Sequence, residues 1–208
     1  MIYGLTFWFG GAGSTLFADL GALDGKPLIA IAGLVAVIVG LGYKASLVPF
    51  HFWAPDAYDG APVSVAAYLS VITKTAAIFA FAQVLRDLPT GSGWPLVIAL
   101  ISAATMTYGY LAAVVQTNLV RLIAYSSVAQ SGYFLMGIVA LGVSPLAVPG
   151  VIIMAAAYVA MNLGAFAIVL VAGRHLDDIR GFGRTHPIAG VAMVVFLLSL
   201  TGIPPLFG

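Results

Sequence analysis

Residues 28–50 read LIAIAGLVAVIVGLGYKASLVPF, an apolar run that contains one charged residue, Lys44, and one proline, Pro49. A helix that crosses the hydrocarbon core of a bilayer needs about 20 apolar residues. The residues of this run do not alternate between apolar and polar, as they do in the strands of a membrane barrel. The run therefore predicts a membrane-spanning helix. We expect Pro49 to break or kink it, because proline leaves the carbonyl near Ala45 without its helical donor.

The rest of the chain has the same character. Of the 208 residues, 62% are hydrophobic and 7% are charged, whereas roughly one quarter of the residues of a soluble domain are charged. The pattern predicts an all-α, polytopic transmembrane helical bundle of about six full spans and a partial one, forming a single transmembrane domain over residues 1–208. The spans are expected near 1–17 (partial), 28–50, 63–86, 95–116, 120–142, 149–172 and 188–208. A second broken helix is expected near Pro204 and Pro205.

Composition also excludes several functions. A chain without cysteine has no thiolate ligand for a metal or an Fe–S cluster, and a net charge of +1 without a basic run gives no footprint for nucleic acid. We find no phosphate loop, no metal-ligand cluster and no nucleophile with a base, so no catalytic residue, cofactor site or metal site is expected in this chain. Both ends of the sequence lie in apolar runs, and we expect a fragment of a longer protein.

The loop charges predict an orientation in the membrane. Successive loops alternate sides, so Lys26 and Arg86 fall on one face of the bilayer and a larger group of arginines falls on the other. That group comprises Arg121, Arg174, Arg180 and Arg184. The positive-inside rule places the loops with these four arginines in the cytoplasm of a multi-pass protein.

Two lysines stand inside apolar spans, where a charge costs at least ~2.5–3.5 kcal/mol at the helix centre. Lys74 is near the middle of its span, with the hydroxyls of Ser70 and Thr73 close by in sequence. Lys44 precedes the break at Pro49, and an interrupted helix beside a lysine is typical of an ion site. Lysine can hold or release a proton as its surroundings change. The alternative is that either side chain extends to the membrane interface.

The sequence offers Lys44 no internal carboxylate, because the chain has no glutamate and its aspartates lie in or near loops. We expect its acidic partner upstream of Met1. A polar row on span 120–142 predicts a wetted helix face, although ordinary interhelical hydrogen bonding is an equal alternative. Asn162 is expected to act in packing, and His51 to lie at the membrane interface. The candidates for lining a channel are Ser70, Thr73, Ser127, Gln130 and Tyr133.

Three stretches of sequence carry a family resemblance. Residues 40–64 read GLGYKASLVPFHFWAPDAYDGAPVS, residues 118–127 read NLVRLIAYSS, and residues 202–205 read GIPP. In this order they resemble the antiporter-like membrane subunits of respiratory NADH:quinone oxidoreductase (complex I). The form PDAYDGAP at residues 55–62 is most similar to the N subunit. The match covers nearly the whole chain and would correspond to about helices six to twelve of a longer subunit.

The resemblance implies a role for both lysines. Lys44 matches the buried lysine of the broken seventh helix, a proton carrier, and Lys74 matches the lysine of the eighth helix, which passes protons along a hydrated axis. Gln130 stands where many relatives carry histidine, and an amide relays hydrogen bonds without titrating.

The resemblance further implies a subunit of a proton-translocating enzyme that has no redox centre in this chain. The partners would be other membrane subunits of the complex, lipid and protons. The complex as a whole would use NADH, flavin, Fe–S clusters and quinone. The alternatives are a subunit of a cation/proton antiporter, which needs neither NADH nor quinone, and a membrane scaffold without transport.

Overall fold

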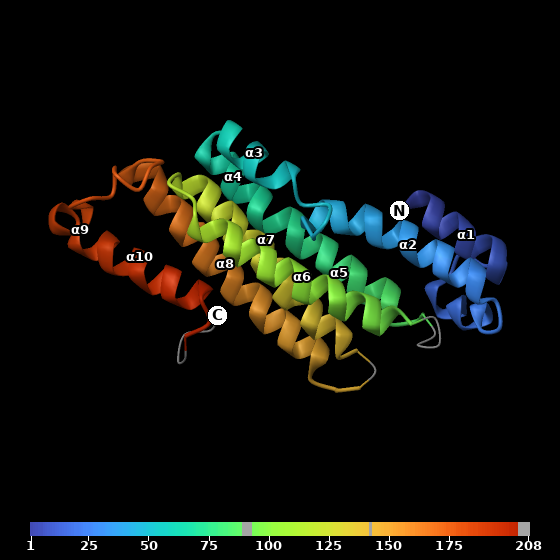
Figure 1. Ribbon diagram of the computed structural model, residues 1–208. Helices are drawn as coiled ribbons and strands as arrows, with labels where there is room; N and C mark the ends of the chain where they lie inside the picture. Colours follow the sequence, from blue (N-terminus) through green and yellow to red (C-terminus); the bar gives the residue numbers. More distant parts are fainter. Residues whose placement is uncertain (89–92, 142, 204–208) are drawn as a thin grey trace.

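The fold is a helical bundle (Figure 1), and the computed structural model describes residues 1–88, 93–141 and 143–203. Helices η1 and η2 are a 3-10 and a π segment, respectively. In chain order the elements are α1 (Ile2–Ala12), η1 (Phe17–Leu23), α2 (Pro27–Ala45), α3 (Trp53–Gly60), α4 (Val63–Tyr68), η2 (Leu69–Thr73), α5 (Lys74–Leu85), α6 (Trp94–Val114), α7 (Leu119–Val139), α8 (Ala147–Ala172), α9 (Phe182–Thr185) and α10 (Pro187–Leu200).

The membrane character expected from the sequence is confirmed. Within the described ranges, five helices are long and apolar enough to cross a membrane. They are α2, the continuous run Val63–Leu85 made by α4, η2 and α5, and then α6, α7 and α8. The sixth apolar helix, α10, is shorter and ends at Leu200, and α1 takes the place of the expected partial span. The break expected near Pro204 and Pro205 lies outside the described residues.

The break expected near Pro49 is present. Helix α2 ends at Ala45, and Ser46 adopts a left-handed conformation with φ of 58°. The N–H of Ser46 closes the last turn by donating to the carbonyl of Tyr43 at 3.1 Å. The chain becomes helical again only at Trp53, where α3 begins. A proline in the middle of this segment removes a donor that a continuous helix would need.

A second irregularity was not expected from the sequence. The π segment η2 interrupts the span Val63–Leu85 and ends immediately before Lys74. A π turn widens the helix and shifts its hydrogen-bond register, and such turns are frequent at functional sites. It therefore places an irregular backbone directly before Lys74.

Close packing of α6 against α7 depends on two glycines. A Cβ atom at Gly109 would lie 2.6 Å from the backbone nitrogen of Ala129, and one at Gly132 would lie 2.8 Å from the carbonyl oxygen of Ser102. Small residues at such contacts let two helix backbones approach closely in lipid, where the hydrophobic effect does not drive helices together.

In Figure 1, α5 to α8 run side by side through the middle of the molecule, with α1 and α2 at one end and α9 and α10 along one side.

The buried apolar side chains form two clusters. The first includes Ile78 of α5 and Tyr158 of α8, and the second includes Tyr58 of α3. Lys74 contacts the ring of Tyr58 and is linked through one serine to Tyr158. The buried charge thus stands between the two clusters.

Candidate functional site

Lys74 is the buried cation of the bundle. Its side chain is 1% exposed, at the centre of the span Val63–Leu85. Its Nζ donates a hydrogen bond of 2.6 Å to Oγ of Ser127 on α7 and lies 5.9 Å from the ring centroid of Tyr58, a cation–π distance. Among the described residues, no ion pair includes Lys74. The charge is therefore compensated by a hydroxyl and an aromatic face.

A chain of buried hydrogen bonds continues from Ser127. Its Oγ lies 2.6 Å from the hydroxyl oxygen of Tyr158 on α8, and the Tyr158 hydroxyl donates to the backbone oxygen of Ser70 in the π segment at 3.0 Å. Asn162, one turn further along α8, donates to Oγ of Ser70 at 2.6 Å. All these side chains are buried. These hydrogen bonds join three spans around Lys74.

The structure brings two of the five channel-lining candidates, Ser70 and Ser127, to Lys74. Thr73 is half-buried, and its hydroxyl donates to the carbonyl of Leu69 in its own helix at 2.5 Å. It takes no part in the chain described above, because its hydrogen is used within the span.

Gln130 and Tyr133 belong to a second polar cluster, on another side of α7. Gln130 donates to the carbonyl of Leu200 at 2.6 Å, and the Tyr110 hydroxyl donates to the same oxygen at 3.2 Å. The ring of Tyr133, 37% exposed, packs edge-on against Tyr110 at 6.2 Å. The polar row of α7 is thus divided, since Ser127 faces α5 and α8 whereas Gln130 faces α10.

Lys44 lies in the last turn of α2 and is exposed in this chain. The resemblance implies a buried lysine at this position, and the difference arises because Lys44 stands on the wall of an open hollow between α1, α2 and α5. Within the described part of the chain, Lys44 forms no ion pair. The hollow is also lined by Met1, Ile2, Tyr3, Gly40, Leu41, Ala76, Ala77 and Ala80.

The helix break holds several buried polar atoms without partners. Within the described residues, Ser46 Oγ, His51 Nδ1 and the Tyr58 hydroxyl have no hydrogen-bond partner. His51 is 2% exposed and packs against the ring of Tyr108, so it is more enclosed than expected for a residue at the membrane interface. Buried polar atoms of this kind usually bind ordered water. Ser46 and His51 lie in the segment between α2 and α3, and Tyr58 lies in α3 beside Lys74.

Sequence reasoning missed Tyr158 and gave Asn162 a packing role only. A signal was present, because the two residues are four apart in the apolar helix α8 and hence share one face. Tyr58, which was not among the candidates, lies in α3, and Lys74 Nζ lies over its ring.

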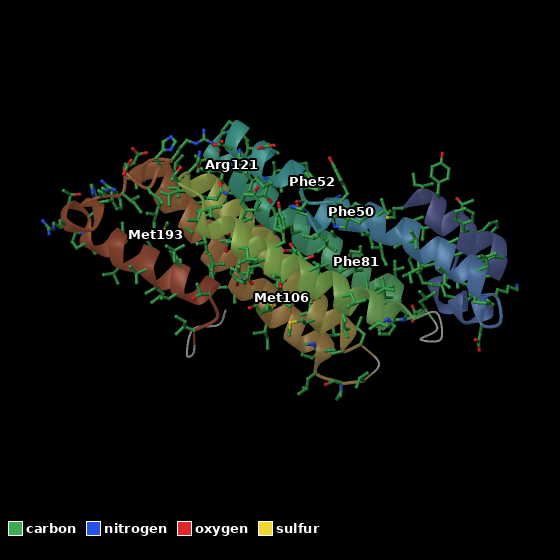
Figure 2. All side chains as sticks on the ribbon, viewed as in Figure 1. Phe50, Phe52, Phe81, Met106, Arg121 and Met193 are labelled. Carbon is green, nitrogen blue, oxygen red and sulfur yellow. The ribbon has the colours of Figure 1, made fainter. Side chains whose placement is uncertain are left out.

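An ionic cluster fastens α3 to the ends of α7 and α8. Arg121 lies 2.8 Å from Asp56 and 3.6 Å from Asp59, and Arg174 lies 3.7 Å from the Asp59 carboxylate. Asn118, which caps α7, donates to Oδ1 of Asp59 at 2.8 Å. In Figure 2, Arg121 lies at the end of the bundle where α3 is found. Asp59 is the shared member of this cluster.

Replacing Asp59 with asparagine is expected to lower the thermal stability of the full-length protein in detergent. The change leaves two arginines without their common carboxylate, and the cost is about 1 kcal/mol for partly exposed pairs. The matched control is Asp177→Asn, because Asp177 pairs with Arg180 and both side chains are about four-fifths exposed. Equal melting temperatures for the two variants would contradict the fastening role of the cluster.

Among the described residues, no group of three or more histidine, aspartate or glutamate side chains is placed to hold a metal ion. The polar groups that the site brings together are one amine, the hydroxyls of Ser127 and Tyr158, and the amide of Asn162.

A family model described as the transmembrane region of NADH:quinone oxidoreductase and Mrp antiporters matches residues 1–208. The chain belongs to this family. The resemblance expected from residues 40–64 is confirmed at this level.

Curated relatives match over the whole chain. NADH-quinone oxidoreductase subunit N 1 of Herpetosiphon aurantiacus is 40% identical, and NADH-quinone oxidoreductase subunit N of Rubrobacter xylanophilus is 42% identical. Each match covers 100% of this chain and 45% of the relative. The chain thus spans somewhat under half the length of these family members.

Solved structures in the same family have the same fold. A chain of respiratory complex I from Thermus thermophilus matches with a TM-score of 0.76 and 32% identity, covering 98% of this chain and 45% of that one. A chain of the Mrp complex from Dietzia sp. matches with a TM-score of 0.80 and 24% identity, covering 98% of this chain and 39% of that one. The second likeness concerns the fold alone.

Proposed function

We propose that this chain is part of the N subunit of a proton-translocating NADH:quinone oxidoreductase in a bacterial cell membrane, and that Lys74 carries the proton. The observation that carries this proposal is a lysine, 1% exposed at the centre of a span, whose ammonium is held by a hydroxyl chain and by no described ion pair. Support comes also from relatives that match the whole chain and bear the name of subunit N.

Lysine suits this role because its amine gains or loses a proton when small movements change its solvation. The hydroxyls of Ser127 and Tyr158 can each accept one proton while donating another. Moving one charge across the membrane potential costs ~2.3 kcal/mol per 100 mV, so the energy must come from outside this chain. The source would be NADH oxidation with flavin, Fe–S clusters and quinone in other subunits.

Lys44 would be the second proton carrier. Its amine stands next to the helix break, and the unpaired polar atoms of Ser46, His51 and Tyr58 supply a route on which water can connect the break with Lys74. We propose that a carboxylate from the part of the subunit outside this chain pairs with Lys44. In the orientation predicted from the loop charges, the end of the bundle that carries Arg121 and Arg174 would face the cytoplasm.

A cation/proton antiporter subunit is the second candidate, because the matching family model covers Mrp antiporters as well as NADH:quinone oxidoreductase. Affinity purification of the tagged full-length protein from its host membrane separates the two. We expect co-isolation with soluble redox subunits, and NADH-driven proton uptake once the purified assembly is placed in proteoliposomes. Isolation with transport subunits alone, without NADH oxidation, would favour the antiporter.

A further inference from the structure

The hydrogen bonds around Lys74 all run in one direction. Tyr158 has a single O–H, and it donates to the carbonyl of Ser70 at 3.0 Å. In its 2.6 Å contact with Ser127, Tyr158 must therefore accept, and the Ser127 hydroxyl must donate. The Ser127 oxygen is then left to accept the hydrogen of Lys74 Nζ at 2.6 Å. The order of donation is Lys74, Ser127, Tyr158 and finally the Ser70 carbonyl.

This series of hydrogen bonds ends on an atom that does not take up a proton. Ser70 lies within the π segment, where the altered register makes a backbone carbonyl available to a partner outside the helix. A peptide carbonyl accepts hydrogen bonds but does not serve as a base in water near neutral pH. As long as Tyr158 donates to Ser70, a proton from Lys74 has no exit along this path. The arrangement favours the charged form of Lys74.

We propose that Tyr158 retains the proton on Lys74 through the hydrogen bond from its hydroxyl to the Ser70 carbonyl, and that it passes the proton on when this bond breaks. This inference rests on the proposed function. Release begins when the Tyr158 O–H turns from Ser70 to a water molecule. The Lys74 proton then moves to the Ser127 oxygen, the Ser127 proton moves to the Tyr158 oxygen, and the Tyr158 proton moves to that water. One proton leaves, and Lys74 becomes neutral.

The surroundings allow the hydroxyl to turn while the ring stays in place. Phe134 packs edge-on against the ring of Tyr158 at 5.6 Å. Asn162, one turn along α8, donates to Ser70 Oγ at 2.6 Å and ties the helix to the π segment. Rotation about the C–O bond of Tyr158 is therefore sufficient to break and remake the hydrogen bond.

Few titratable groups face Lys74. Among the described residues they are Tyr58 on α3 and Tyr158 on α8, together with His51 in the segment before α3, whose pKa is lowered by burial and, to a smaller extent, by the Lys74 charge. From α7 the contact is Ser127, and Lys44 on α2 lines a separate hollow. Within the described chain, no carboxylate lies within 4.0 Å of the Lys74 amine. The hydroxyl chain is thus the main polar contact that sets the proton affinity of Lys74.

The test is Tyr158→Phe in the full-length subunit within the intact complex, reconstituted in proteoliposomes. NADH-driven proton uptake is measured as a function of pH. We expect the maximal rate to fall, because phenylalanine has no hydroxyl to pass the proton on. We also expect the alkaline limb of the profile to move to lower pH by about 0.5–1 unit, the effect of one buried hydrogen bond. The reason is that Ser127, freed from Tyr158, can turn and donate to the neutral amine. The matched control is Tyr68→Phe, an exposed tyrosine on the same span, whose profile should remain that of the wild type.

The outcomes distinguish this inference from the proposed function. An unchanged profile for Tyr158→Phe, while Lys74→Ala still abolishes uptake, overturns the role of Tyr158 alone. Normal uptake by Lys74→Ala overturns the proposed function as well. If Tyr158→Phe fails to assemble, Ser127→Ala interrupts the same hydrogen bonds and should move the alkaline limb in the same direction, because the Lys74 ammonium loses its acceptor. No shift in that variant overturns the inference.

Discussion

Replacing Lys74 with alanine in the full-length subunit is expected to lower the rate of proton translocation by the intact complex by about 100-fold or more, the range typical for loss of a proton-transferring group. The change removes the amine from the buried hydroxyl chain and leaves Ser127 and Tyr158 without a group that takes up a proton at neutral pH. The measurement is NADH-driven proton uptake in proteoliposomes, normalised to the amount of assembled complex.

Lys74→Arg separates proton transfer from a structural role of the positive charge. Arginine keeps the charge and the hydrogen bond to Ser127 but does not release its proton in a protein. We expect this variant to be as inactive in proton uptake as the alanine variant. Recovery of uptake with arginine would mean that the site needs a fixed charge and not a proton carrier. Lys26→Ala, a change at an exposed lysine before α2, is the control and should leave uptake unchanged.

Replacing Gly109 with valine is expected to prevent stable assembly of the subunit. A Cβ atom at this position would lie 2.6 Å from the backbone nitrogen of Ala129, and a backbone atom cannot move aside by changing a rotamer. Overpacking of this kind costs about 1–3 kcal/mol or more, and here it separates α6 from the helix that carries Ser127. The measurement is the amount of subunit in the purified complex and its melting temperature in detergent.

The control for steric overlap is Gly150→Val in α8. Gly150 is also helical, but a Cβ atom there would meet no other heavy atom within 4 Å. Both substitutions carry the same cost of placing valine in a helix. Equal assembly of the two variants would show that the α6–α7 contact tolerates separation.

The spans were predictable because a helix that crosses the bilayer must be long and apolar. The run 28–50 predicted a helix that in the structure extends over Pro27–Ala45, and the proline in that run predicted the break before α3. Length, hydropathy and loss of a backbone donor are local properties. They can be read without knowing which helices are neighbours.

The site was predictable only in part because its contacts are not local. Lys74 meets Ser127 across 53 residues, and Ser70 meets Asn162 across 92. Spacing shows which residues share a helix face but not which faces meet. The same limit explains why Gln130, three residues after Ser127, was grouped with it although it contacts Leu200 instead.

Helix α3 has only 8 residues, and it makes contact with two parts of the protein that differ in depth. Asp59 is held by arginines at the rim of the bundle, while the adjacent residue, Tyr58, is fully enclosed with its ring against the Lys74 ammonium. Two successive residues of one short helix thus lie at the rim and in the interior of the bundle. A shift of α3 as a unit that lengthened the ion pairs of Asp59 would also change the distance between the Tyr58 ring and the Lys74 amine, because both residues belong to the same short helix.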